Sequence, residues 1–275
     1  MAIPPHATAA ERIWSYALRG LVVLVCIFLV APIIVVIPLS FNSEPYFTFP
    51  MPGYSLRWYE QLFASESWRR AAYNSLVVGV STTCISTVLG TLAALGLRRA
   101  NFALKGFVAG LMISPIIVPV IITAVGIYFF MSSLGIANSR LGLVLGHIVL
   151  ASPFVVVTVT AALTGLDENL VRAGASLGAG PVRVFFRIIL PLIMPGIVTG
   201  AIFAFVTSFD ETVLALFLSG PDGHTLPREM WKGIRQQINP VILCVSALLV
   251  MVSLIVLAAM EGVRRRLAAT RGSIE

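Results

Sequence analysis

Long stretches without charged residues dominate this sequence and determine the solvent in which it can fold. About 20 consecutive apolar residues in a helix cross the hydrocarbon core of a bilayer, which is about 30 Å thick. Six stretches meet this requirement, centred on Leu21–Leu39, Ala71–Leu97, Phe107–Met131, Leu141–Leu163, Leu192–Phe217 and Val241–Met260. With 58% hydrophobic and 11% charged residues, the chain has too little polar surface for a water-soluble globule. We therefore predict an all-α integral membrane protein with about six transmembrane helices, which excludes a soluble enzyme.

The basic residues predict the orientation of these helices, because Lys and Arg are enriched in cytoplasmic loops. With the N-terminus inside, 12 of the 19 Lys and Arg residues fall on the cytoplasmic side. We expect a single transmembrane domain, 1–275, with cytoplasmic segments at 1–18, 164–190 and 261–275. The first span lacks a small-residue cleavage site and is predicted to be retained. This topology accounts for the net charge of +7, so no nucleic-acid partner is needed to explain it.

Residue types that carry chemistry are sparse and scattered. Cys26, Cys84 and Cys244 fall within apolar spans, where a thiol behaves as a small hydrophobe. The three histidines lack metal-ligand spacing and are interpreted as packed or solvated. Neither lysine follows a glycine as in a phosphate-binding loop. We expect no metal or cofactor on this chain, and any ATP and Mg to be bound by a partner.

Two outer connections are longer than turns need to be. Residues 42–70 are rich in aromatic side chains, and Ser55 is placed to cap a short helix on which Leu56, Tyr59 and Phe63 share a face. An aromatic belt at the lipid headgroups and a direct role toward substrate or a partner both fit this pattern. The second connection, 218–240, begins with a Ser-Gly-Pro-Asp-Gly turn signal and is predicted to be ordered and water-facing.

The cytoplasmic segment 164–195 predicts two short helices at an angle. Asp167 can cap the first helix, and Gly178 supplies its terminating glycine. Apolar residues recur on one face of this helix: Leu166, Leu170, Ala173 and Leu177. Pro181 suits the start of the second helix, which Pro191 is expected to end. This elbow can dock a partner, whose backbone could approach Ala173, Gly174 and Ala175 closely, or it can rest on lipid.

The residues of the elbow resemble the EAA loop of binding-protein-dependent ABC importer permeases. Gly178 and the Leu190-Pro191 pair stand at the spacing of that motif, whereas Arg172 occupies its acidic position and Gly174 replaces an alanine. The resemblance implies the type I permease fold and a coupling helix that docks on an ATPase subunit. The coupling residues implied are Arg172, Ala173, Gly174, Gly178, Leu190 and Pro191.

The resemblance extends over nearly the whole chain. Its motifs are Ser40-Phe41-Asn42-Ser43, Leu56-Arg57-Trp58-Tyr59, Tyr73-Asn74-Ser75, Thr225-Leu226-Pro227 and Gly233-Ile234-Arg235. Together they are similar to the second permease of spermidine/putrescine importers. That family implies a related permease, two ATPase subunits and a periplasmic solute-binding protein as partners, in a bacterial inner membrane. An importer of an opine or amino-acid derivative is the alternative within the same subfamily.

Asp210 and Glu211 interrupt the fifth apolar span near its predicted outer end. A charged acid at mid-bilayer costs about 2.5–3.5 kcal/mol on insertion scales, so both are expected at the bundle interior or its outer mouth. They can attract a cationic solute to the path, or they can form a salt bridge to Arg228 or Arg235 that holds the outer loop. Neighbouring residues on a helix point about 100° apart, so one of the two is expected to face the path.

A secondary transporter or channel working alone is the main rival from another class, and a purely structural membrane protein is a third interpretation. Transporters of the first kind usually place several ionisable groups near mid-membrane, and only the two acids qualify here. The pairs Gly142/Gly146 and Gly196/Gly200 have the spacing of close helix contacts. The mechanism implied by the resemblance is alternating access driven by ATP on partner subunits.

Overall fold

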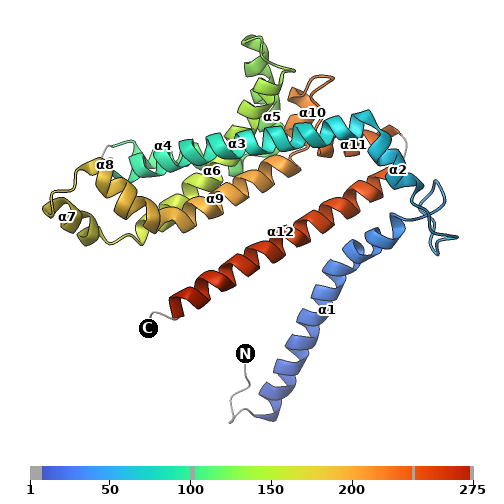
Figure 1. Ribbon diagram of the computed structural model, residues 1–275, viewed down its shortest axis with the longest axis horizontal. Coiled ribbons are helices and arrows are strands. Elements are labelled where there is room, and N and C mark those ends of the chain that lie inside the picture. The colour runs from blue at the N-terminus through green and yellow to red at the C-terminus, as the bar shows by residue number, and fades with distance from the viewer. Residues whose placement is uncertain (1–7, 100–102, 237–238, 273–275) are drawn as a thin grey trace. The chain divides into compact units, whose positions relative to one another are not determined.

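The computed structural model describes residues 8–99, 103–236 and 239–272, and these residues are almost entirely helical (Figure 1). The elements, in chain order, are α1 (Ala9–Leu39), α2 (Arg57–Ala64), α3 (Glu66–Arg99), α4 (Lys105–Ile117), α5 (Val120–Ser133), α6 (Arg140–Thr164), α7 (Glu168–Ser176), α8 (Pro181–Val184), the π-helix η1 (Phe185–Ile189), α9 (Leu190–Asp210), α10 (Val213–Leu218), α11 (Leu226–Gln236) and α12 (Val241–Gly272). The predicted all-α fold is confirmed.

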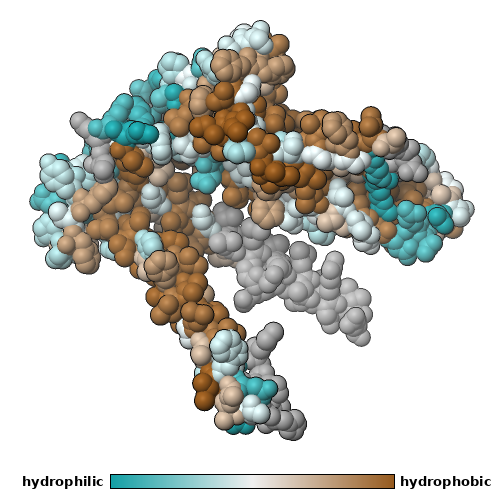
Figure 2. All heavy atoms as spheres, turned by 180° about the vertical axis from the view of Figure 1, so that it is seen from behind, coloured by the Kyte–Doolittle hydropathy of each residue, from teal (hydrophilic) through white to brown (hydrophobic). Residues whose placement is uncertain are grey.

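Among the described residues, four helical runs are long and apolar enough to span a membrane, and α4 with α5 can form a fifth. The four runs are Ala9–Leu39, Glu66–Arg98, Arg140–Thr164 and Pro181–Asp210. A shorter apolar run, Val241–Ile255, begins α12 and lies within the sixth predicted span, Val241–Met260. Apolar residues cover much of the helix surface, and hydrophilic residues gather near helix ends and loops (Figure 2). Lipid is the solvent that suits such a surface.

The third predicted span is not one helix. Helices α4 and α5 are bent by 109° at their junction, where Val118 is extended with ψ of 134° and Pro119 precedes the first turn of α5. A proline has no N–H for the helical ladder, and it disfavours helical geometry in the residue before it. The expected continuous helix Phe107–Met131 is therefore wrong.

The chain divides into two compact units, residues 1–65 with 233–275 and residues 66–232. In the first unit, the Trp58 indole N–H donates to the Asn42 carbonyl at 2.8 Å, and the hydroxyls of Ser40 and Tyr59 are 2.7 Å apart. The Cys244 thiol of α12 donates to the Ser40 carbonyl. Two motifs singled out in the sequence, 40–43 and 56–59, thus meet at one place.

The buried face of α2, the short helix of the first outer connection, is not the face that was predicted. Trp58 and Leu62 are buried, whereas Leu56 and Phe63 are exposed. Ser55 accepts from the Arg57 N–H at 3.2 Å, although Leu56 occupies the N-cap position. The exposed residues remain available to lipid or to a partner.

The second unit is built on α3, α6 and α9, which pack closely along their lengths. One buried apolar cluster joins these three helices to the elbow, and a second joins α3 and α6 to α5 and α10. Gly196 and Gly200 of α9 lie against α6, so that an added Cβ at Gly200 would stand 2.9 Å from the Val155 Cα. At Gly146 it would stand 2.6 Å from the Leu214 side chain of α10. The predicted close helix contacts are confirmed for Gly146, Gly196 and Gly200, whereas Gly142 lies against the Ile136 carbonyl in the turn before α6.

Candidate functional site

Helix α7 begins and ends at the residues predicted to bound it. The Asp167 carboxylate accepts from the Asn169 N–H at 2.9 Å, which satisfies one of the free donors of the first turn. Gly178 has φ of +82°, a backbone region in which a side chain is disfavoured. Its N–H and that of the following residue bond to carbonyls of the last turn at 3.0 and 3.1 Å, as in a Schellman motif.

The apolar face of α7 points away from the rest of its unit. Leu170 is 47% exposed, Leu177 is 88% exposed and Ala173 is exposed as well, whereas Leu166 is buried at the start of the elbow. Val171 is partly buried and packs on the apolar cluster beneath. The elbow therefore presents an apolar surface, Leu170, Ala173 and Leu177, that its own unit leaves uncovered.

Gly174 faces the inside of the elbow and is buried there. A Cβ at this position would lie 2.5 Å from the Ile188 Cδ1 of η1 and 3.6 Å from the Val184 side chain. The missing methyl group therefore allows α7 to approach the second arm of the elbow. The expectation that Gly174 faces a partner together with Ala173 and Ala175 is wrong, because only the two alanines are exposed.

The second arm of the elbow continues into the membrane helix without a break. Residues Pro181–Asp210 form one helical run, and η1 within it bonds the Leu190 N–H to the Phe185 carbonyl in i→i+5 geometry. Pro191 lies in the first turn of α9, where the locally wider π-turn accommodates a residue without an N–H. The predicted stop at Pro191 is therefore wrong.

Arg172 belongs to a row of three charged side chains, in which Glu168 lies between Arg172 and Arg98. Its Nη2 lies 3.6 Å from the Glu168 carboxylate one turn earlier, and Glu168 also lies 3.5 Å from the Arg98 Nη2 of α3. Arg98 donates to the Leu166 carbonyl at 3.4 Å. The side chain of Arg172 is 76% exposed, so its head remains accessible. Arg98 and Glu168 were missed in the sequence, although Glu168 and Arg172 have the i,i+4 spacing of a helical ion pair.

Asp210 and Glu211 lie at the end of α9 and have different environments. Asp210 is the last residue of the helix and is exposed. The Glu211 carboxylate accepts from the N–H groups of Val213 and Leu214 at 2.7 and 3.0 Å, so it caps α10. Arg228, one predicted partner of these acids, instead donates to the carbonyl and hydroxyl of Ser219. Since α9 ends at Asp210 and α10 begins at Val213, the predicted fifth span Leu192–Phe217 is not one helix but is broken at this acidic pair.

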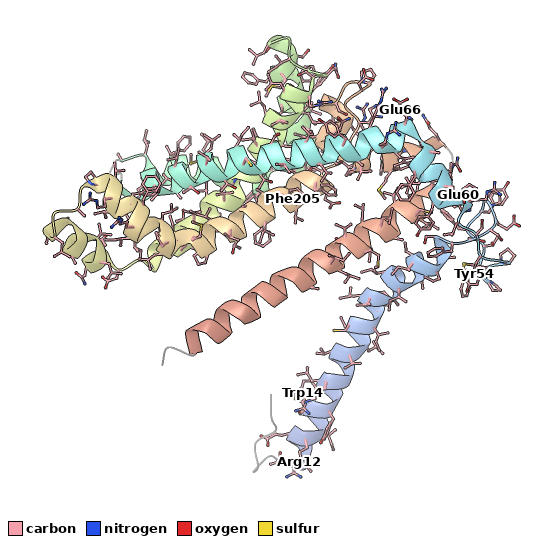
Figure 3. All side chains as sticks on the ribbon, viewed as in Figure 1. Arg12, Trp14, Tyr54, Glu60, Glu66 and Phe205 are labelled. Atoms are coloured by element: carbon pink, nitrogen blue, oxygen red, sulfur yellow. The ribbon has the colours of Figure 1, made fainter. Side chains whose placement is uncertain are left out.

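The second outer connection is tied to the start of α3 by polar contacts. The Asn74 amide donates to the carbonyls of Asp222 and His224 at 2.8 and 3.1 Å, and it accepts from Arg140 at 3.0 Å. The Ser75 hydroxyl accepts from the Leu226 N–H at 2.7 Å. The Tyr73-Asn74-Ser75 motif therefore fixes the loop over the bundle, beside Glu66 of Figure 3.

Glu229 is buried within this connection and carries two charged contacts. Its carboxylate lies 2.9 Å from the His224 ring and 3.2 Å from the Lys232 ammonium. Burial alone raises the pKa of Glu229, but the hydrogen bonds and charges of His224 and Lys232 outweigh burial and hold it below 4.5. The predicted order of this connection is confirmed for residues 218–236, and residues 237–238 lie outside the described residues.

The interior of the second unit contains buried polar side chains. His147 of α6 is 1% exposed, and its Nδ1 lies 2.8 Å from the Ser208 hydroxyl of α9. The packed interpretation of this histidine is confirmed. Phe205, one turn earlier on α9, lies beside Gly79 of α3 (Figure 3). Within residues 8–99, 103–236 and 239–272, no three His, Cys, Asp or Glu side chains gather as metal ligands.

The sequence that forms this membrane bundle and its exposed elbow matches a known family of transport proteins. The family model for the inner membrane component of binding-protein-dependent transport systems matches residues 86–269. This chain belongs to that family.

Individual relatives are similar to this chain over most of their length. The chain is 32% identical over 246 residues to the spermidine/putrescine permease PotC of Escherichia coli K12. The aligned region covers 90% of this chain and 93% of that one. It is 33% identical over 229 residues to the putrescine permease PotI of the same strain, covering 81% of each. A bacterial ABC transporter that imports the acidic polysaccharide alginate has the same fold, with a TM-score of 0.75 at 15% identity over 95% and 99% of the two chains.

Proposed function

We propose that this chain is one of two permease subunits of an ABC importer for a cationic polyamine such as spermidine or putrescine. The observation that carries the proposal is similarity at about one-third identity, along 81–90% of the chain, to permeases named for these solutes. The likeness to the alginate importer supports the fold alone, because its identity is only 15%.

The elbow supports coupling to a separate ATPase subunit in the cytoplasm. Leu170, Ala173 and Leu177 offer an apolar surface, and the exposed Arg172 adds a charge beside it. In alternating access, closure of the ATPase dimer displaces this surface. Because α8 continues into α9, the displacement reaches the membrane helices directly.

The outer end of the chain supports delivery by a periplasmic binding protein. The connection from Ser219 to Lys232 is ordered by Asn74 and Glu229, and its exposed Asp222 carboxylate lies 3.4 Å from the Arg70 Nη1. Asp210 adds a second exposed carboxylate at the end of α9. Carboxylates at the mouth of a low-dielectric path attract ammonium groups. The setting is a bacterial inner membrane, with both termini in the cytoplasm.

Reconstitution of the complete set tests the proposal. The chain, a second permease, two ATPase subunits and a binding protein are placed in vesicles, and ATP hydrolysis and uptake are measured for spermidine, putrescine, an opine and an amino acid. We expect ATP-dependent uptake of the polyamines. A matched control carries an ATPase subunit that binds but does not hydrolyse ATP.

Two results would contradict the proposal in different ways. Uptake of an opine or amino-acid derivative in place of polyamines would change the solute and keep the class. Uptake by this chain without any ATPase subunit would indicate a secondary transporter, which is the second candidate from the sequence.

A further inference from the structure

A lateral groove separates α4 from α6 near the end of the bundle that carries the elbow. It encloses about 630 Å³, a volume within the usual range of small-molecule sites. Its walls are Ala109 and Ile113 of α4 and Val156, Val157 and Thr160 of α6. All of these residues belong to the second unit.

The walls of this groove are apolar along almost their whole depth. The Thr164 hydroxyl, at the end of the groove, donates to the Thr160 carbonyl at 2.9 Å, so its polar group is satisfied within the helix. From Lys105 to Ile113 the groove follows α4 for eight residues, roughly 12 Å at 1.5 Å per residue. One leaflet contributes about half of the 30 Å hydrocarbon core. The groove therefore has the length of most of one leaflet.

Two cations stand at the elbow end of the groove, Arg98 of α3 and Lys105 of α4. Glu168 lies 3.5 Å from the Arg98 Nη2, and the Leu166 carbonyl accepts from the same nitrogen at 3.4 Å. Both contacts are long for hydrogen bonds to a guanidinium. Since the guanidinium has five N–H donors, Arg98 can bind a further anion through its other nitrogens.

We propose that this groove binds an anionic phospholipid, with an acyl chain between α4 and α6 and the phosphate at Arg98 and Lys105. An apolar trough of leaflet length that ends in two cations matches a lipid with a negative headgroup in both shape and charge. Basic pockets between membrane helices bind such headgroups. A soluble anion would use the cations but leave the apolar walls without a ligand.

The position of Arg98 connects this site to the elbow. Arg98 and Leu163 line the lipid groove and also a second cavity of about 360 Å³ beneath α7, which includes Glu168 and Arg172. A phosphate bound through the other nitrogens of Arg98 shares the charge of the guanidinium with Glu168. The bound lipid thereby weakens the link between α3 and α7 and adjusts the position of the coupling surface.

Native mass spectrometry of the purified importer, titrated with phosphatidylglycerol or phosphatidylcholine of equal chain length, tests the site. We expect phosphatidylglycerol to bind more tightly. Lys105→Gln should weaken its binding roughly fivefold, since a basic residue near the surface contributes about 1 kcal/mol, and should leave phosphatidylcholine unchanged. Arg183→Gln, an exposed basic residue of the elbow, is the matched control and should change neither.

A second pair of variants tests the groove itself. Ile113→Trp fills the groove and should abolish retention of the lipid, whereas Leu111→Trp, on the same helix and 62% exposed, should not. Equal binding of the two lipids, or equal loss in both tryptophan variants, would overturn the proposal. A disulfide between Ile113→Cys and the second permease would also overturn it, because a protein helix would then occupy the groove.

Discussion

Gly178 offers the sharpest test of the coupling elbow, because its backbone and not its surroundings sets the cost of a side chain. Its φ is +82°, and no atom lies within 4 Å of a Cβ built there. A left-handed conformation costs a residue with a side chain roughly 1–2 kcal/mol. Such a cost reduces the population of the native turn by a factor of about 5 to 30. Asn tolerates this conformation better than other residues with side chains.

Gly180 provides a matched control two residues away. It is also exposed, and nothing lies within 4 Å of its added Cβ, but its φ is −63°. We expect Gly178→Ser to lower the affinity of the ATPase subunit for the permease pair, and with it ATP-dependent uptake, by up to the same factor. Gly178→Asn should lose less and Gly180→Ser almost nothing. Gly178→Leu adds bulk to the strain, and the protein should be inserted but uncoupled.

The assay is a titration of purified ATPase subunit onto the reconstituted permeases, with uptake measured on the same vesicles. Equal losses in Gly178→Ser and Gly178→Asn would show that backbone strain is not the cause. A similar loss in Gly180→Ser would mean that any side chain on this turn obstructs docking. Unchanged uptake in Gly178→Leu would refute the coupling role of the elbow itself.

Three further predictions concern the outer end and the core. Asp210→Asn should reduce polyamine uptake with unchanged abundance and basal ATPase activity, whereas Glu211→Gln should have the smaller effect because its amide oxygen can still cap α10; the reverse order would contradict these roles. Gly200→Ala should destabilise the purified protein by about 1–3 kcal/mol through overpacking against α6, and Gly110→Ala, with open space around it, should not; similar melting curves would refute the packing argument. Because the pKa of Glu229 is lowered in the fold, its stabilisation is present at neutral pH and lost as pH falls through that pKa, so the difference in melting temperature between wild type and Glu229→Gln should hold from neutral pH to about pH 5 and shrink below about pH 4.3, the ordinary pKa of Glu; a difference that stays constant at low pH would disprove the linkage.

The features predicted from the sequence are those encoded by neighbouring residues. The ends of α7 followed from Asp167 and Gly178, because capping and left-handed glycine are local. The bend at Pro119 had the same kind of local signal, a proline after a β-branched residue. Hydropathy alone does not register it, because both sides of the bend are apolar.

Contacts between residues far apart in the chain could not be predicted from the sequence. Arg98 and Glu168 are 70 residues apart, and His147 and Ser208 are 61 apart, so no local pattern pairs them. The side of α7 that is buried was also not predictable, since Gly174 and Ala173 are both small. The close approach of Gly174 to Ile188, a residue of η1, decides which side is buried.

The continuity of Pro181–Asp210 determines how the elbow can act on the path. This run joins the arm of the elbow at one end to Asp210 at the other, roughly 43 Å away at 1.5 Å per residue. Its base belongs to the same buried cluster as Ala94 of α3 and Val155 of α6. Close-packed interiors compress little, so a push on the elbow displaces these helices together instead of deforming the turn. On the proposed function, the force of ATP hydrolysis therefore reaches the outer carboxylate through one helix, and no hinge at Pro191 is needed.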